Sequence, residues 1–530
     1  MAQTPFRGNL QSMTFPLLSS LQAPTVIDTR GDQVFFPSVS TDGQVPTDRG
    51  VPTAFYAHNI MPSTYGFQTI NYQNVFAAPE DATVFDEAQL VFATRGTINP
   101  TPTGFRSYMA IGKDITSGDN FLYVVDVDFL NWRQITGGQP TIPDGTVMTT
   151  ANVNGVTYIF LSGVGAFFYD DTIDMILTRT LDGLDVSEII GLASSNGYLF
   201  AWKPDAVAWS SVVDVEDFVP SDVSGAGGGS VQEAAGRIIT VRATNLGFII
   251  YTEGNAVSVT YSGNEEFPWT FKSILGSGGV ADAKQVTRDQ NNGAHYAYTT
   301  SGLQQISHVK TTTVLPHITD FLGGNIFEDF DYDTDTFTLE EFAGSFKKQI
   351  SLVSDRYVII SYGTPGGSGF THALVVDLVQ SRMGKLKYAH VHCFDRVDIT
   401  EGVVEVARKS ITFLGQDGLS AYVDFDLSNP APSDAVLILG KFQLTRSRLV
   451  EMQEVHLENI RTGTVFECFS YTSLDGKNLG TPQAGYLLSQ GTDTRHYLFD
   501  AGSGINCSLL LKGVFNLISY VLWLTHGGRY

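Results

Sequence analysis

The sequence is poor in cysteine, in basic residues and in long apolar runs. Its three cysteines, Cys393, Cys468 and Cys507, are too few and too widely spaced for a disulfide framework or a zinc site. This scarcity fits folding in a reducing cytoplasm. No apolar run approaches the roughly 20 residues of a membrane-spanning helix, and the first residues lack the basic and apolar segments of a secretory signal. We therefore expect neither a secreted disulfide scaffold nor a membrane-spanning protein.

Basic residues are outnumbered by acidic ones, 32 against 55, and the formal net charge is −23. Such a surface repels phosphate backbones, which argues against a protein that wraps nucleic acid. It does not argue against DNA that passes close by without adhering.

Glycine, aromatic residues and short alternating runs are plentiful. The 53 glycines and 12% aromatic residues suit many short strands joined by tight turns, and 43% hydrophobic residues are enough for a packed core. Hairpin signals such as Asn154-Gly155, Asn196-Gly197 and Asn292-Gly293 recur with a period of about 40–50 residues, as in the blades of a β-propeller. The sequence therefore predicts an all-β fold with a propeller of six or seven blades. A series of β-sandwiches is the alternative.

Changes in composition divide the chain into three parts. Residues 1–85 are rich in Pro, Thr, Gly and Asn and are predicted to form an extended N-terminal arm, which packs on its own propeller or on a neighbouring subunit. Residues 86–427 carry the repeated hairpins of the propeller. After Pro430 and Pro432 the predicted strands become longer, and residues 428–530 are predicted to form a C-terminal β-sandwich.

An acidic run is the first candidate for chemistry. Asp329, Asp331, Asp333 and Asp335 alternate in the sequence and partly resemble a calcium loop, which uses spaced carboxylates as hard oxygen ligands. Thr336 stands where such a loop needs glycine, and Phe342 stands where it needs glutamate. The alternative is a solvated strand edge, because a period of two places all four acids on one face.

Other motifs are incomplete. His390, His392, Cys393 and Asp395 could suggest a metal site, but in one strand Cys393 points away from the histidines. The glycines at 225–229 lack the Lys and Ser/Thr of a phosphate-binding loop, and LGSGGVA at 275–281 is followed by a predicted strand instead of a helix. There is no Gly-x-Ser-x-Gly elbow, and SLDGKN at Ser473 is a single near miss of the sialidase box. We therefore expect no enzyme activity, no cofactor and no metal, and interpret the glycine segments as flexible loops.

One region resembles a known family. Between Gly191 and Ser307 the chain carries Trp209-Ser210 and then the acidic step Asp214–Phe218. A strand pair containing GFIIYTEGNAV and the segment GSGGVADAK follow, and the order of features continues into the C-terminal strands. This pattern resembles the tail hub, or nozzle, proteins of short-tailed bacteriophages, also described as packaged-DNA stabilisation proteins. The similarity covers about residues 100–530.

The resemblance implies a structural virion protein, made in the host cytoplasm, which forms a ring, usually six-fold, at the distal end of the tail. Its partners would be further copies of itself, an adaptor or tube protein above, a tail needle, spike or fibre, and genomic DNA that passes through without specific binding. Together with the acidic composition, it suggests residues that line or gate the channel: Asp214, Glu216, Asp217, Gly227, Gly228, Glu328, Asp329, Asp331, Asp333 and Asp335. A solvated outer surface is the other interpretation of these residues.

A different class of function stays open. The chain could be a receptor-binding or tailspike-like virion protein, or a propeller that binds or cleaves glycans. Tailspikes usually have β-helix repeats of about 20–30 residues, roughly half the period seen here. A glycan-cleaving propeller would need acids that converge at its mouth.

Overall fold

The computed structural model of this chain describes most of the residues between 104 and 397 and shorter stretches on both sides. The described residues are 25–28, 34–35, 47–48, 51–62, 67–70, 72–76, 83–94, 104–125, 132–170, 173–264, 268–287, 294–315, 322–323, 326–332, 334, 336–353, 356–367, 369–379, 382–397, 407–415, 420–424, 434–442, 448–459, 466–473, 481–487, 494–499, 504 and 506–529.

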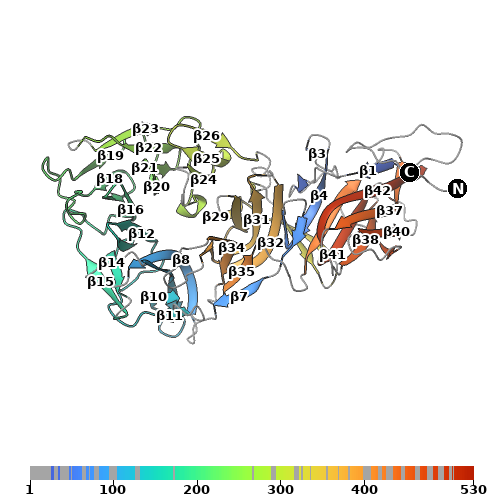
Figure 1. The fold of residues 1–530 in the computed structure, drawn as a ribbon, viewed down its shortest axis with the longest axis horizontal. Coiled ribbons are helices and arrows are strands. Elements are labelled where there is room, and N and C mark those ends of the chain that lie inside the picture. Colours follow the sequence, from blue (N-terminus) through green and yellow to red (C-terminus); the bar gives the residue numbers. More distant parts are fainter. Residues whose placement is uncertain are drawn as a thin grey trace.

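Six small antiparallel sheets, together with strands β29–β32 of the large 17-stranded sheet, follow one another around a ring and form a seven-bladed β-propeller (Figure 1). The prediction of an all-β propeller with six or seven blades is therefore confirmed. Blades 1 to 3 contain β8–β11 (Thr83–Thr94, Gly104–Asp114, Asn120–Val125, Trp132–Gln134), β12–β15 (Met148–Val153, Val156–Leu161, Gly165–Asp170, Met175–Arg179) and β16–β19 (Gly191–Ser195, Tyr198–Trp202, Ala206–Trp209, Gly227–Ser230). Blades 4 to 6 contain β20–β23 (Ile238–Thr244, Gly247–Thr252, Ala256–Tyr261, Trp269–Ser273), β24–β26 (Ala294–Thr299, Gly302–Ser307, Thr311–Thr313) and β29–β32 (Lys347–Val353, Tyr357–Gly363, Phe370–Asp377, Arg382–His390).

The last blade is completed by a strand from the beginning of the chain. Blade 7 contains β33 (His392–Val397), β34 (Ala407–Leu414) and β35 (Ser420–Asp424), and its outer edge is β7 (Gln73–Phe76), which pairs with β35. The inner strand β33 contacts β8 of blade 1, which closes the ring. The sequence interpretation placed residues 73–76 in the arm, because a four-residue strand carries no periodic signal of its own.

Turn chemistry explains the regular hairpins. Asn154 and Gly155 both have positive φ, 52° and 79°, and so do Asn196 and Gly197, at 53° and 81°. Two successive positive φ angles define the type I′ turn, whose twist matches that of the two strands it joins. These pairs therefore fix the register between the first two strands of blades 2 and 3.

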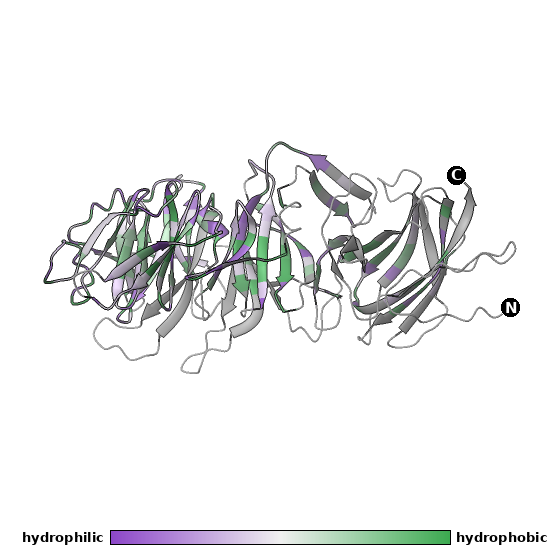
Figure 2. Cartoon of the chain, turned by 90° about the horizontal axis from the view of Figure 1, so that it is seen from above, coloured by the Kyte–Doolittle hydropathy of each residue, from purple (hydrophilic) through white to green (hydrophobic). Residues whose placement is uncertain are grey.

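Aromatic side chains fill the space between neighbouring blades. Between blades 3 and 4, Phe200 stacks on Phe248 with ring centroids 4.4 Å apart, and Trp269 lies edge-on to Phe200 at 6.1 Å. Large buried rings contribute the most apolar area per residue, so this contact holds the two sheets at a fixed distance. In the edge-on view of the propeller, green apolar residues lie along the strands (Figure 2).

The C-terminal strands form two curved layers that face each other. One layer contains β36 (Val436–Phe442), β41 (Asn506–Gly513) and β38 (Phe466–Ser473); the other contains β42 (Asn516–Arg529), β37 (Arg448–Asn459) and β40 (Thr494–Phe499). Strand β39 (Thr481–Leu487) pairs with β38 and β40 and so connects the layers. Leu509 and Leu511 of one layer share a core with Leu522 and Leu524 of the other.

Early strands bind these layers to the propeller. Strands β1 (Thr25–Asp28), β4 (Val51–His58) and β6 (Phe67–Thr69) pair with β42, β36 and β42, while β5 (Ile60–Pro62) pairs with β32 of blade 6. One hydrophobic cluster runs from Leu303 and Ile350 in the propeller through Ile60 to Leu522 in the C-terminal layers. Within the described residues, no helix is long and apolar enough to cross a membrane.

Candidate functional site

The acidic run of the sequence forms a hairpin at the junction between the propeller and the C-terminal layers. Its strands are β27 (Ile326–Asp331) and β28 (Thr336–Glu341), with Asp329 opposite Thr338. Asp331 is exposed next to the turn. For Glu328 only the backbone is described, in β27, while Asp333 and Asp335 lie outside the described residues.

The two faces of β27 contact different parts of the molecule. Phe330 is buried against Tyr56, with ring centroids 6.0 Å apart, and shares a cluster with Val436 and Ile438 of the C-terminal layers. On the other face, Phe327 packs on His372 of blade 6 at 4.9 Å. Side chains alternate between the faces of a strand, so this one hairpin is wedged between the two parts of the protein.

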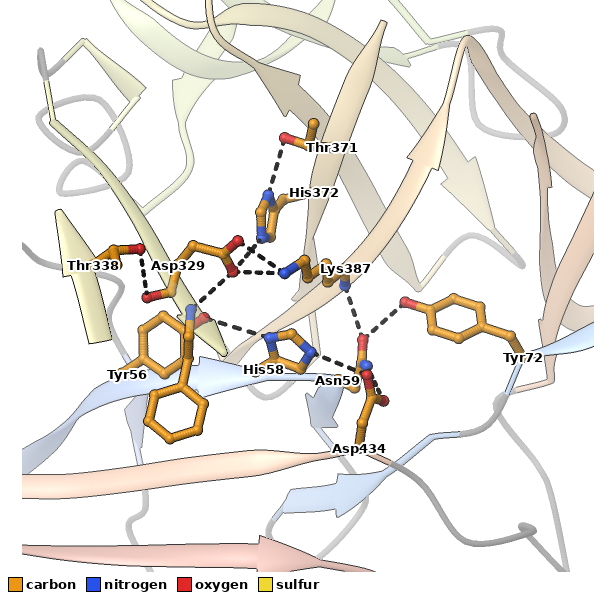
Figure 3. A network of polar contacts seen from close by, with 11 residues as sticks. Tyr56, His58, Asn59, Tyr72, Asp329, Thr338, Thr371, His372, Lys387 and Asp434 are labelled. Carbon is orange, nitrogen blue, oxygen red and sulfur yellow. Dashed lines mark hydrogen bonds and ion pairs between the residues drawn. The ribbon is translucent and has the colours of Figure 1, made fainter. Parts of the chain in front are cut away.

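Asp329 is held by a lysine and a histidine of blade 6 (Figure 3). The Lys387 ammonium donates to both of its carboxylate oxygens, at 2.9 and 2.8 Å, and His372 Nε2 lies 3.8 Å away. Burial by itself would raise the pKa of Asp329, but the nearby His372 ring and the two hydrogen bonds and charge of Lys387 outweigh it and lower that pKa well below the usual range. Burial lowers the pKa of His372 to about 3, so its ring is neutral at neutral pH.

A second group of contacts connects three distant segments at the same junction. Asn59 accepts from the backbone N–H of Lys387 at 2.9 Å and from the Tyr72 hydroxyl at 3.0 Å, and its amide donates to Asp434. His58 Nε2 lies 3.4 Å from the same Asp434 carboxylate. The early strands, blade 6 and the start of the C-terminal layers therefore meet in one polar network (Figure 3).

This network connects the early strands, blade 6 and the start of the C-terminal layers through contacts among its own side chains. Lys387 engages both oxygens of Asp329, and the described histidine, asparagine and aspartate side chains contact one another. In the part of the chain that the structure describes, no three His, Cys, Asp or Glu residues are grouped as metal ligands. The calcium interpretation of the acidic run therefore gains no support from Asp329.

The predicted channel residues of blade 3 lie in the loop between its two outer strands, β18 and β19. Glu216 accepts from the Tyr158 hydroxyl at 2.9 Å and lies 3.5 Å from Arg179, both in blade 2. The Asp214 carboxylate accepts from the backbone N–H of Glu216 at 3.1 Å, and that of Asp217 accepts from the N–H of Val219 at 2.9 Å. These acids order the loop and fix it against blade 2. They lie away from the inner strands that surround the propeller axis.

The glycine segment of blade 3 was expected to be a flexible loop, and this expectation is wrong for Gly227 and Gly228. They begin strand β19, where Gly227 is opposite Trp209 and Gly228 is opposite Ala208. A Cβ at Gly228 would lie 2.6 Å from the carbonyl oxygen of Val207. The glycines therefore permit close approach of an edge strand, a role that composition alone does not distinguish from flexibility.

The His and Cys residues near 390 belong to two strands and are hydrogen-bonded. His390 Nε2 contacts the Ser361 hydroxyl at 2.8 Å, and its Nδ1 contacts the Tyr388 carbonyl at 2.6 Å. The Cys393 thiol, buried in β33, receives a bond from Ser361 at 3.2 Å. Both nitrogens of His390 are thus occupied within the protein.

The sequence interpretation missed most of the junction. His58, Asn59, His372, Lys387 and Asp434 are far apart in the chain, and Asn59 and Asp434 are separated by 375 positions. Asn59 has a positive φ of 54°, a conformation that asparagine adopts more readily than most residues. No motif marks the other four residues.

Comparisons with known proteins found matches among solved structures. No family model matches the chain, and no curated protein matches it. Among solved structures, the WD40 β-propeller domain of Doa1 is 9% identical, with 68% of this chain and 99% of that chain covered and a TM-score of 0.39. YCF48 bound to a D1 peptide is 11% identical, with 69% and 97% covered and a TM-score of 0.34.

Proposed function

We propose that this chain is a structural subunit of the ring-shaped tail hub, or nozzle, of a short-tailed bacteriophage, where it helps to retain packaged DNA and passes it on during ejection. The main support is the order of sequence features from Gly191 to Ser307, which resembles that family. The proposal places the protein in the virion tail, below an adaptor or tube protein and next to a needle, spike or fibre.

The junction is compatible with a load-bearing role. A subunit of a conduit must keep its parts in a fixed arrangement while DNA moves past. Here a continuous hydrophobic cluster, the wedged hairpin and the Asn59 network connect the propeller to the C-terminal layers. Large apolar contacts of this kind oppose independent movement of two units.

The acidic composition suits a channel that DNA does not adhere to. With a net charge of −23 per subunit, a ring of copies repels the phosphate backbone, whereas each Lys or Arg contact would add a salt-dependent attraction. We propose that the β19 edge containing Gly227 and Gly228, together with the part of the preceding loop that contains Asp217, faces this channel. Asp329 is engaged at the junction, so we do not propose it as a channel residue.

Electron microscopy of the purified protein and of intact tails tests this function. We expect closed rings in solution or at the distal tail end, and no retention of duplex DNA in a mobility-shift assay at about 0.15 M salt. A protein that stays monomeric and cleaves or binds a glycan would instead support the receptor- or glycan-binding alternative and refute the hub.

A further inference from the structure

Two exposed patches on the outer rim of the propeller have opposite charge. We infer that they are the two halves of one contact between copies of this chain, and that this contact builds the ring. The inference rests on the proposed function for the ring's purpose, while the contact itself is argued from the two surfaces.

The first patch, the acidic rim, is the loop 210–226 of blade 3. Val213 and Val223 are 89% and 96% exposed, and Val212 and Val219 of the same loop are about half exposed. Single exposed valines are common on protein surfaces, but four in one loop that is fixed against its neighbours are not explained by the fold of the monomer. Between 204 and 236 the sequence has no Lys or Arg and six acids: Asp205, Asp214, Glu216, Asp217, Asp222 and Glu233.

The second patch, the basic rim, lies where blades 4 and 5 meet. Its apolar members, Leu275 and Val309, are each 87% exposed, and Lys272 and Lys310 lie beside them. The Thr311 hydroxyl donates to the Leu275 carbonyl at 2.9 Å, which brings the two loops together.

Lys272 belongs to the same patch because of its place in the ladder. It is directly opposite Ser258 in the β22–β23 pair, and the Ser258 hydroxyl contacts His308 Nδ1 at 2.6 Å. Opposite residues of an antiparallel pair point to the same face, so Lys272 points towards the His308 turn of blade 5. Residues 268–281 and 300–315 contain no Asp or Glu.

The two surfaces match each other better than either matches itself. Exposed apolar groups on both sides are removed from water when the two patches meet, and the opposite charges around them attract. Two acidic rims, or two basic rims, would place like charges together. The contact is therefore heterologous, with the acidic rim of one copy on the basic rim of the next.

The positions of the patches favour a closed ring. The acidic rim lies between blades 2 and 3 and the basic rim between blades 4 and 5, two blade positions apart, which is roughly 100° around a seven-bladed propeller. In a ring of n copies the two contacts of a subunit diverge by 180° − 360°/n, so roughly 100° corresponds to four or five copies. Val212 lies beside the Gly197 turn at one end of the blades, while Val309 and Lys310 lie in the β25–β26 turn at the other end, so the propellers tilt relative to the ring axis when such a ring closes.

This arrangement also orients each subunit. The bisector of the two contacts points from the propeller through blades 3 and 4, so these blades face the centre of the ring, including the edge strand β19. The C-terminal layers lie on the other side of the propeller, beyond blade 6, and point outwards (Figure 1). The proposed channel residues of blade 3 are then next to the lumen.

Cysteine cross-linking tests the contact directly. The three native cysteines are buried, so Val213→Cys and Val309→Cys each add one accessible thiol. Mixing these two variants under mild oxidation should give a disulfide-linked pair that contains one copy of each. Ile115→Cys, 62% exposed in blade 1 and outside both patches, is the matched control and should not cross-link with either variant.

Charge reversal gives a second and independent readout. The double variants Asp214→Lys/Asp222→Lys and Lys272→Glu/Lys310→Glu should each weaken self-association by at least about tenfold in sedimentation, because each meets a rim of its own sign. Mixing the two variants restores opposite charges at every contact and should restore assembly.

The outcomes separate this contact from the proposed function. Rings that persist in both double variants, or a Val213→Cys and Val309→Cys mixture that forms no mixed adduct, overturn the contact but leave the hub intact. If the mixed disulfide forms and mixing restores assembly, but this protein is absent from phage tails, the contact is supported and the hub function is refuted. Cross-linking of Val213→Cys only to itself would show a two-fold contact and overturn the heterologous arrangement.

Discussion

Phe330 provides the sharpest test of how the propeller and the C-terminal layers are held together. Its ring is 1% exposed and lies against Tyr56 of β4 and against Val436 and Ile438 of β36, on the C-terminal side of the hairpin. Replacing a buried phenylalanine by alanine removes its apolar area and leaves a cavity, which together cost about 3–5 kcal/mol. We expect Phe330→Ala to fall in this range.

Hydrogen–deuterium exchange shows where that free energy is lost. The amides of β4 and β36 should exchange faster in Phe330→Ala, because local opening of the junction becomes easier, while blade 3 should exchange as in the unmodified protein. Thr338→Ala, an exposed substitution on the partner strand of the same hairpin, is the control and should change stability by less than about 0.5 kcal/mol. If Phe330→Ala accelerates exchange only within the hairpin, the hairpin does not join the two parts and does not keep them in a fixed arrangement.

Three further predictions concern charge, pH and backbone packing. Burial lowers the pKa of His372 from 6.5 to about 3, so between these pH values the unfolded chain binds a proton that the folded chain does not. Stability should therefore fall as the pH is lowered from about 6.5 to about 3, by up to about 1.4 kcal/mol per pH unit. The variant His372→Gln should remove this part of the pH dependence in thermal unfolding. Asp377 is fully buried and paired with Arg356 at 2.6 Å, so Arg356→Leu should destabilise the protein by about 3–5 kcal/mol. The control Lys113→Met breaks the exposed pair with Asp144 and should cost less than about 1 kcal/mol. Equal shifts in the denaturation midpoint of the two variants would show that burial does not set the cost of losing the cation. Gly228→Ala should displace β19 and lower the free energy of unfolding by about 1–3 kcal/mol, because the new Cβ meets the Val207 carbonyl. Gly229→Ala has open space around the new Cβ and should leave the free energy of unfolding unchanged. The fluorescence of Trp209, which lies opposite Gly227, reports the displacement.

Local sequence patterns were sufficient for the repeated hairpins of the propeller. Asn154-Gly155 and Asn196-Gly197 favour positive φ angles, and the flanking alternation of apolar residues selects a strand period. Both signals depend only on residues within a few positions of each other. The period between such turns then indicated the number of blades, which the structure confirms.

Tertiary structure decided how the ends of the chain are used and what the marked residues do. Strand β7 completes a blade with residues almost 350 positions later, and Asn59 meets Lys387 and Asp434, because long-range pairing depends on the whole fold. The same applies to Asp329, which an acidic run suggested as a ligand or channel residue but which Lys387 engages. The sequence alone determined the repeated hairpins and the overall charge, since these follow from residue type and local spacing. Which charges are exposed, and which form ion pairs inside the protein, follows only from the positions of partners that are distant in the sequence.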